Sequence, residues 1–134
     1  MGRSFALLLL DLDGLKGIND AYGHLTGSRA LCRLGDTLRV HSRETDTAAR
    51  YGGDEFALVL PEIGAEAAQQ VARRIRARLA RDGEDPPISV SVGVAVFPGD
   101  GQTIRDLLNT ADRALYEQKS RVPRRLTKSQ LTSS

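Results

Sequence analysis

The segment of this sequence with the clearest chemical potential is residues 50–56, in which two glycines precede two carboxylates. Short apolar segments flank it, and they predict two strands joined by a tight turn. Gly52 and Gly53 tolerate the positive φ that such a turn demands, and without Cβ atoms they leave room for a phosphate group. Asp54 and Glu55 would concentrate negative charge at an exposed tip, which suits Mg²⁺ or Mn²⁺ bridging to phosphate oxygens. An ordinary polar turn explains the same residues.

A second acidic group follows the first apolar run, residues 5–10. A continuous apolar run predicts a fully buried central strand whose end opens into a site. Asp11 and Asp13 are two residues apart, so they share one face of the strand. Both could point at one cation, with the Leu12 carbonyl between them. A strand followed by an aspartate turn or a helix cap is the alternative.

The rest of the chain must position these two groups. Hydrophobic periodicity predicts helices over residues 15–23, from 25 or 26 to about 40, over 65–81 and from 103 onward, and strands over 47–51, 56–60 and 88–97. Gly93 in the last strand indicates a bulge or a close neighbour. The five arginines of the helix at 65–81 are interpreted as a solvated face. This order predicts a mixed α/β sheet covered by helices.

Composition points to one soluble globular domain, with 40% apolar and 27% charged residues. The amino-terminal apolar run is too short to span a bilayer, so neither a membrane anchor nor a signal peptide is recognised. Cys32 is the only cysteine, which excludes an internal disulfide and is compatible with the cytoplasm. Residues 121–134 hold four of the 19 basic residues and no acidic one, so we expect a frayed tail. The body is slightly acidic, which argues against a nucleic-acid partner.

These residues together resemble the GGDEF family, the diguanylate cyclases that make cyclic di-GMP from two GTP molecules. The resemblance covers almost the whole chain. Four motifs at family spacing carry it: Asp11-Leu12-Asp13 with Lys16, Asn19-Asp20, Tyr22, Gly23-His24 and Gly27; Arg50 to Phe56; Ser91-Val92-Gly93-Val94-Ala95; and Ala111 to Tyr116 followed by Lys119.

The resemblance implies a palm-like α/β (α+β) fold related to nucleotide cyclases and polymerases, over residues 1–120. Its mixed, mainly antiparallel sheet would be flanked by helices. Asp11, Asp54 and the Leu12 carbonyl would hold Mg²⁺ or Mn²⁺, with Glu55 as the second hairpin carboxylate. Asp54 or Glu55 is placed to help deprotonate the attacking 3′-hydroxyl of GTP.

The same resemblance implies the substrate contacts. Lys16 and Lys119 would meet the triphosphate with His24 near it, Asn19 would read guanine, and Gly52 and Gly53 would adjoin the nucleotide. Each domain would bind one GTP, so catalysis would require a homodimer.

A feedback site is also implied. Arg43 and Asp46 stand where the family has its inhibitory Arg-x-x-Asp motif for cyclic di-GMP. An arginine and a carboxylate together suit the edge of a guanine base.

Several positions depart from the family pattern. Ser28 stands where the family usually has Asp, Leu15 where it has Phe, and Val122-Pro123-Arg124 replaces a Gly-Arg-Asn sequence. The chain begins at the strand that follows the family's Leu-Thr-Gly-Leu-x-Asn-Arg type segment, so we expect a truncated domain. Three interpretations stay open: an active or weakly active cyclase, a regulatory module that binds GTP or cyclic di-GMP, and a structural dimerisation domain.

Overall fold

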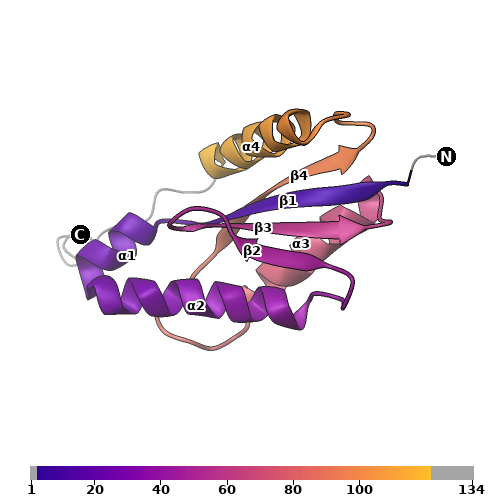
Figure 1. Cartoon of the computed structure of the whole chain (residues 1–134). Helices are drawn as coiled ribbons and strands as arrows, with labels where there is room; N and C mark the ends of the chain where they lie inside the picture. The colour runs from indigo at the N-terminus through magenta and orange to yellow at the C-terminus, as the bar shows by residue number, and fades with distance from the viewer. Residues whose placement is uncertain (1–2, 122–134) are drawn as a thin grey trace.

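The structure, a computed structural model, describes residues 3–121 (Figure 1). The predicted order of helices and strands is confirmed. In chain order the elements are β1 (Phe5–Leu12), α1 (Leu15–Tyr22), α2 (His24–Val40), β2 (Thr47–Arg50), β3 (Glu55–Pro61), α3 (Ala65–Ala80), β4 (Val90–Phe97) and α4 (Ile104–Ser120). Except for Arg121, the predicted tail lies outside the described residues. None of the helices in residues 3–121 combines the length and apolar character needed to cross a bilayer.

The four strands form one antiparallel sheet in the order β2-β3-β1-β4, so β1 lies between β3 and β4. Phe5 at its start pairs with Pro61 on one side and Phe97 on the other. Leu8 and Leu10 are completely buried, as predicted for a central strand. The predicted α/β (α+β) fold with a mainly antiparallel sheet flanked by helices is confirmed, and all three strand pairs of the described residues are antiparallel.

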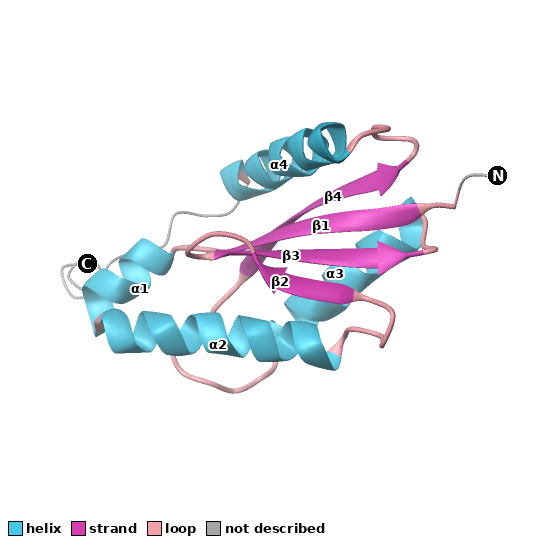
Figure 2. Ribbon diagram, in the orientation of Figure 1, coloured by secondary structure: helices cyan, strands magenta, loops and turns pink. Residues whose placement is uncertain are grey.

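Helices cover both faces of the sheet (Figure 2). Even-numbered residues of β1, such as Leu8, pack in the larger core cluster with Leu34 of α2 and Ile75 of α3. Odd-numbered residues, such as Leu9, pack in a smaller cluster with Leu107 of α4. The α4 face is therefore the one on which odd-numbered side chains of β1 project.

Two element boundaries differ from the prediction for local reasons. Gly23 has a φ of 94°, which turns the chain so sharply that α2 begins at His24, directly after it. β4 begins at Val90 and not at residue 88, because Val90 pairs with Leu12, the last residue of β1. Ile88 and Ser89 lie beyond the end of β1 and pair with no strand of residues 3–121.

The prediction that all five arginines near α3 face water is wrong for Arg76. This side chain is partly buried, and its Nη1 donates a hydrogen bond of 2.7 Å to Oε1 of Gln118 on α4. The same oxygen accepts a bond of 2.7 Å from the backbone N–H of Val92 on the edge strand β4. A helical period cannot show this contact, because the acceptor comes from an element 42 residues further along the chain.

Gly93 is the point at which β4 and α4 come closest. A Cβ added there would lie 2.0 Å from the carbonyl oxygen of Ala111 and 2.5 Å from the backbone nitrogen of Leu115. Pairing with β1 continues through Leu9 and Gly93, so the glycine marks a close neighbour and not a bulge. Only a residue without a side chain lets α4 lie this near the strand.

Gly93→Ala is expected to lower the free energy of unfolding by about 1–3 kcal/mol, the usual cost of overpacking a core. Backbone atoms surround the added methyl group, so the clash can be relieved only by moving α4. Urea denaturation measures the effect. Gly35→Ala is the control, because its Cβ would meet the Phe56 ring at an ordinary 3.6 Å. Equal midpoints for wild type and Gly93→Ala would contradict the close packing of α4.

Candidate active site

The turn between β2 and β3 carries the glycine pair. Gly52 has a φ of 90°, the left-handed value expected at a tight turn. A Cβ added at either Gly52 or Gly53 would meet no atom within 4 Å. Nε of Arg50 donates to the Gly53 carbonyl (3.0 Å), and the guanidinium lies 6.0 Å from the centre of the Phe56 ring. Arg50 thus ties the turn to its strands and leaves the space beside both glycines open.

The strand register brings Asp11 to the hairpin carboxylates. Asp11 pairs with Glu55 on β3 and with Ser91 on β4. Paired residues of antiparallel strands project to the same face, here the face that α4 covers. Asp54 directly precedes Glu55, and its negative charge acts on both Asp11 and Glu55. The three carboxylates that the sequence singled out therefore lie together at the end of β1.

The charged forms of these carboxylates are disfavoured by burial and by their mutual repulsion. Burial raises the pKa of Asp11; the charge of Asp54 adds to the rise, and Lys119 opposes it. Burial also raises the pKa of Glu55, and the charges of Asp11 and Asp112 act in the same direction. Asp112 on α4 therefore belongs to this acidic group, although no sequence pattern placed it there.

Lys119, in the last turn of α4, supplies the positive charge. Its Nζ lies 3.4 Å from Oδ2 of Asp11 and 3.6 Å from Oδ1 of Asp13. Both oxygens of Asp13 also accept hydroxyl bonds, from Ser89 at 2.7 Å and from Ser91 at 2.6 Å. Asp13 thus binds two serine hydroxyls and pairs with Lys119, and these contacts hold the chain segment after β1 in place. The structure does not support the interpretation that Asp13 shares a cation with Asp11.

The other predicted nucleotide contacts lie on α1 and α2. Lys16, His24 and Ser28 are exposed. Asn19 is partly buried between the two helices and lies against Gly27, the residue before Ser28. The structure therefore brings Asn19 beside the start of α2 and leaves the two basic side chains accessible to solvent.

Arg43 and Asp46, the predicted inhibitory pair, bind each other. Nη2 of Arg43 lies 2.8 Å from Oδ1 of Asp46, and the backbone N–H of Arg43 donates to Oδ2 at 2.7 Å. Nη2 also donates to the Pro61 carbonyl at 2.9 Å. The Asp46 side chain is 2% exposed and that of Arg43 is 53% exposed. Asp46 therefore orients the arginine, while the arginine is accessible to a ligand.

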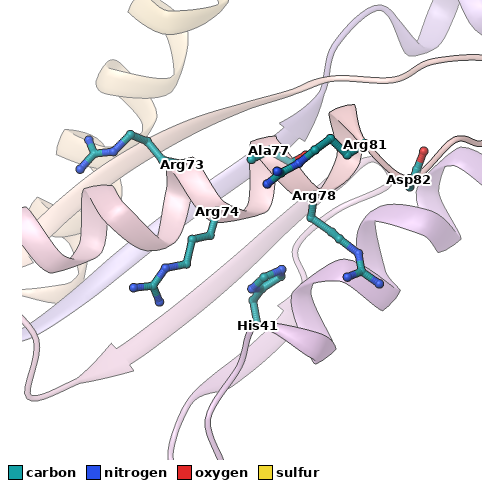
Figure 3. A pocket seen from close by; sticks show the side chains of 7 residues that line it. All are labelled: His41, Arg73, Arg74, Ala77, Arg78, Arg81 and Asp82. Carbon is teal, nitrogen blue, oxygen red and sulfur yellow. The ribbon is translucent and has the colours of Figure 1, made fainter.

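A basic groove is formed by His41, two residues before Arg43 in the chain, and by residues of α3 and the turn after it. The sequence did not indicate this groove. Figure 3 shows Arg74 and Arg78 of α3 extending toward the side on which His41 lies, and His41 follows the end of α2. The cavity is about 630 Å³ and is lined by His41, Arg73, Arg74, Ala77, Arg78, Arg81 and Asp82. Burial lowers the pKa of His41, as do Arg78 and Arg74, and its Nε2 is buried without a hydrogen-bond partner. The four-residue spacing of Arg74 and Arg78 was the available signal, since it places both on one side of the helix.

The acidic residues fit a hard cation as a partial ligand set. Within residues 3–121, no group of three or more His, Cys, Asp or Glu side chains is arranged to hold a metal ion by itself. However, Oδ1 of Asp11 is buried without a hydrogen-bond partner, next to two further carboxylates. Mg²⁺ characteristically takes one or two carboxylates and completes its coordination with water and substrate phosphates. An open set of this kind suits a cation that binds together with a nucleotide.

Sequence comparison identifies the family to which this fold and acidic hairpin belong. Residues 1–125 match the family model described as diguanylate cyclase, GGDEF domain. This match covers most of the chain, which therefore belongs to the GGDEF domain family.

Curated relatives are much longer than this chain. It is 42% identical over 121 residues to the bifunctional diguanylate cyclase/cyclic di-GMP phosphodiesterase MucR of Pseudomonas aeruginosa, covering 87% of this chain and 18% of MucR. It is 36% identical over 130 residues to diguanylate cyclase A of Treponema denticola, covering 93% of this chain and 35% of that protein.

Solved structures share the fold. The GGDEF domain of YfiN, also called TpbB, from Pseudomonas aeruginosa matches with a TM-score of 0.83 and 35% identity, over 90% of this chain and 78% of that one. The GGDEF domain of DgcB from Caulobacter crescentus, solved in complex with c-di-GMP, matches with a TM-score of 0.80 and 31% identity, over 92% and 77%.

Gln118→Ala is expected to loosen the last turn of α4, which carries Lys119. The substitution leaves the buried N–H of Val92 without its acceptor, at a cost of about 1–3 kcal/mol. Amide hydrogen exchange should show a faster Val92 N–H, and urea denaturation an earlier midpoint. Glu117→Ala changes the neighbouring exposed side chain and should alter neither. Unchanged exchange at Val92 in Gln118→Ala would contradict this anchoring of α4.

Proposed function

We propose that this domain is a diguanylate cyclase that condenses two GTP molecules into cyclic di-GMP and pyrophosphate. The observation that carries the proposal is the pairing of Asp11 with Glu55, beside Asp54 and below Lys119, in a member of the GGDEF family. Relatives that carry the name diguanylate cyclase support it. The same carboxylates argue against a purely structural domain, which would gain nothing from their repulsion.

The reaction is a phosphoryl transfer. The 3′-hydroxyl oxygen of one GTP attacks the α-phosphorus of the other and gives its proton to Asp54 or Glu55. As the new O–P bond forms, the bond from the α-phosphorus to the oxygen leading to the β-phosphate breaks, and pyrophosphate leaves. The raised pKa of Glu55 makes it a stronger base than an ordinary carboxylate. Two such transfers close the ring of cyclic di-GMP.

Mg²⁺ or Mn²⁺ would be held by Asp11, the Leu12 carbonyl, Asp54 and Glu55. When bound, such an ion neutralises charge on the phosphate oxygens. Lys119 and Lys16 are proposed to bind the triphosphate and His24 to lie beside it, with the open space at Gly52 and Gly53 available for close approach. We place the reaction in the cytoplasm, where GTP is available.

Two copies of the domain are needed for this chemistry. Each holds one GTP, and the attacking hydroxyl comes from the nucleotide of the other copy. We therefore propose that catalysis occurs in a homodimer whose hairpins face each other, and that activity rises with protein concentration.

A second candidate is a regulatory module that binds GTP or cyclic di-GMP without turnover. Ser28 favours it, since this exposed hydroxyl on α2 carries no charge with which to bind the N–H donors of guanine. Formation of cyclic di-GMP from GTP and Mg²⁺ supports the first candidate. Nucleotide binding without product supports the second.

Asp11→Asn and Asp54→Asn are each expected to abolish formation of cyclic di-GMP and to keep the fold. Each change preserves shape and removes a charge. When folding raises the pKa of a carboxyl group, the folded protein becomes less stable as the pH rises from the unfolded pKa through the folded one, because the group must then be charged in an unfavourable site. The pKa of Asp11 is raised in this way, so at neutral pH the Asp11→Asn protein should be at least as stable as wild type. Chromatography of the product and thermal denaturation measure the two effects.

The control for these variants is Glu84→Gln, which changes an exposed carboxylate in the loop between α3 and β4 and should alter neither property. Wild-type turnover by either aspartate variant at saturating metal would remove that residue from the site.

Product feedback is proposed at Arg43 and Asp46. The accessible guanidinium of Arg43 would bind a guanine of cyclic di-GMP while Asp46 holds it in place. The basic groove beside His41 would favour the negative phosphates of the same ligand. DgcB, a matched relative, was solved with c-di-GMP bound.

Arg43→Ala is expected to weaken cyclic di-GMP binding about ten- to a hundredfold, the cost of a lost charge-assisted hydrogen bond. Isothermal calorimetry measures the affinity. Arg39→Ala is a matched control, because Arg39 is also exposed and also pairs with an aspartate three residues away, Asp36. Equal affinities for Arg43→Ala and wild type would remove the pair from the feedback site.

A further inference from the structure

One glycine of α2 leaves the room that one side chain of α1 occupies. A Cβ added to Gly27 would lie 1.8 Å from Oδ1 of Asn19 and 2.9 Å from its Cγ. Cδ1 of Leu15 would be next, at 3.3 Å. The Asn19 carboxamide therefore fills the volume that any other residue at position 27 would need.

The backbone fixes this contact. The N–H of Gly23 donates to the Asn19 carbonyl at 2.8 Å, and the Gly23 carbonyl accepts from the N–H of Gly27 at 3.3 Å. Both residues are thus bonded to the single residue that joins the two helices. These two bonds limit how far the two helices can move apart, so a Cβ at position 27 would be accommodated by displacing the Asn19 side chain.

The carboxamide is held in an unusual state. Its Oδ1 is buried and has no hydrogen-bond partner. Buried polar atoms in folded proteins nearly always have one, so an exception needs an explanation. This one lies against Gly27, the residue that precedes the exposed Ser28 in α2.

We propose that Gly27 is a positioning residue for recognition of the purine base, because it provides the space that holds the Asn19 carboxamide at the junction of α1 and α2. The inference rests on the proposed function, in which Asn19 contacts guanine. Any side chain at position 27 expels the carboxamide from the junction. Contact with the base is then lost, while Lys119 and the carboxylates at the end of β1 keep their positions.

The test compares the affinities of GDP and ADP, which differ in the base and are not condensed. In Gly27→Ala, the preference for GDP over ADP is expected to fall by about three- to tenfold, as for loss of one hydrogen bond. Affinity for ADP should stay the same. Calorimetry gives both constants.

Gly17→Ala is the matched control. Gly17 is a helical glycine on α1, and a Cβ there would meet no atom within 4 Å. Alanine favours the helix more than glycine does, so this variant should be at least as stable as wild type and keep its GDP preference. A general effect of Gly→Ala changes on this helix pair would appear in both variants.

A double variant separates positioning from misfolding. In an Asn19→Ala protein, the two atoms that would clash most severely with a Cβ at position 27 are gone. Adding Gly27→Ala should then leave the ratio of GDP to ADP affinity unchanged, although the same change lowers that ratio in wild type. This non-additivity is the signature of two residues that act through one contact.

Each remaining outcome decides the matter. If Asn19→Ala lowers the GDP preference and Gly27→Ala does not, the inference is overturned and the proposed base contact stands. If Gly27→Ala lowers the GDP preference of the Asn19→Ala protein as much as that of wild type, the effect does not pass through the carboxamide and the inference is overturned. If Asn19→Ala leaves the preference unchanged, Asn19 does not read the base and the inference fails, while cyclic di-GMP formation still tests the proposed reaction independently.

Discussion

The pairing of β1 with β3 and β4 is the constraint on which the rest of this domain depends. β1 lies between β3 and β4 in the single sheet and is packed on both faces, so apolar contacts in two core clusters set its register at once. A slip of one residue would turn every side chain of β1 to the opposite face. Asp11 would then leave the α4 face and lie away from Glu55 and Lys119. The apolar core thus determines the geometry of the acidic site.

The acidic site in turn determines what α4 must do. Three carboxylates at the end of a buried strand repel one another, and burial makes their charged forms less favourable still. Lys119 offsets part of this repulsion, and it can do so only if the last turn of α4 lies over the end of β1. Gly93 allows the helix to approach, and Gln118 secures it to the sheet edge and to Arg76. The packing of one helix therefore serves an electrostatic requirement.

Charge is divided between two regions of the molecule. The end of β1 is acidic, while the groove between His41 and α3 is strongly basic. The net charge of the whole chain, formally only +2, gives no sign of these two oppositely charged regions. Arg43 lies close to the basic region in the sequence, and its guanidinium is already oriented by Asp46. A ligand with phosphate and guanine groups would find complementary partners there and not at the acidic site.

The sequence by itself determined the elements and the family. The apolar run of β1, the alternation of β4 and the cap at Thr103, whose Oγ1 accepts from the Asp106 backbone N–H at 3.1 Å, are local features that short-range periodicity and capping chemistry can predict. Asp54 and Glu55 were recognisable because two glycines and two acids stand together. Only the tertiary structure decided the role of Asp13, the burial of Arg76, the groove of α3 and the contact between Asn19 and Gly27. Each of these depends on a side chain or hollow contributed by a different element, and a local pattern carries no information about which elements will meet.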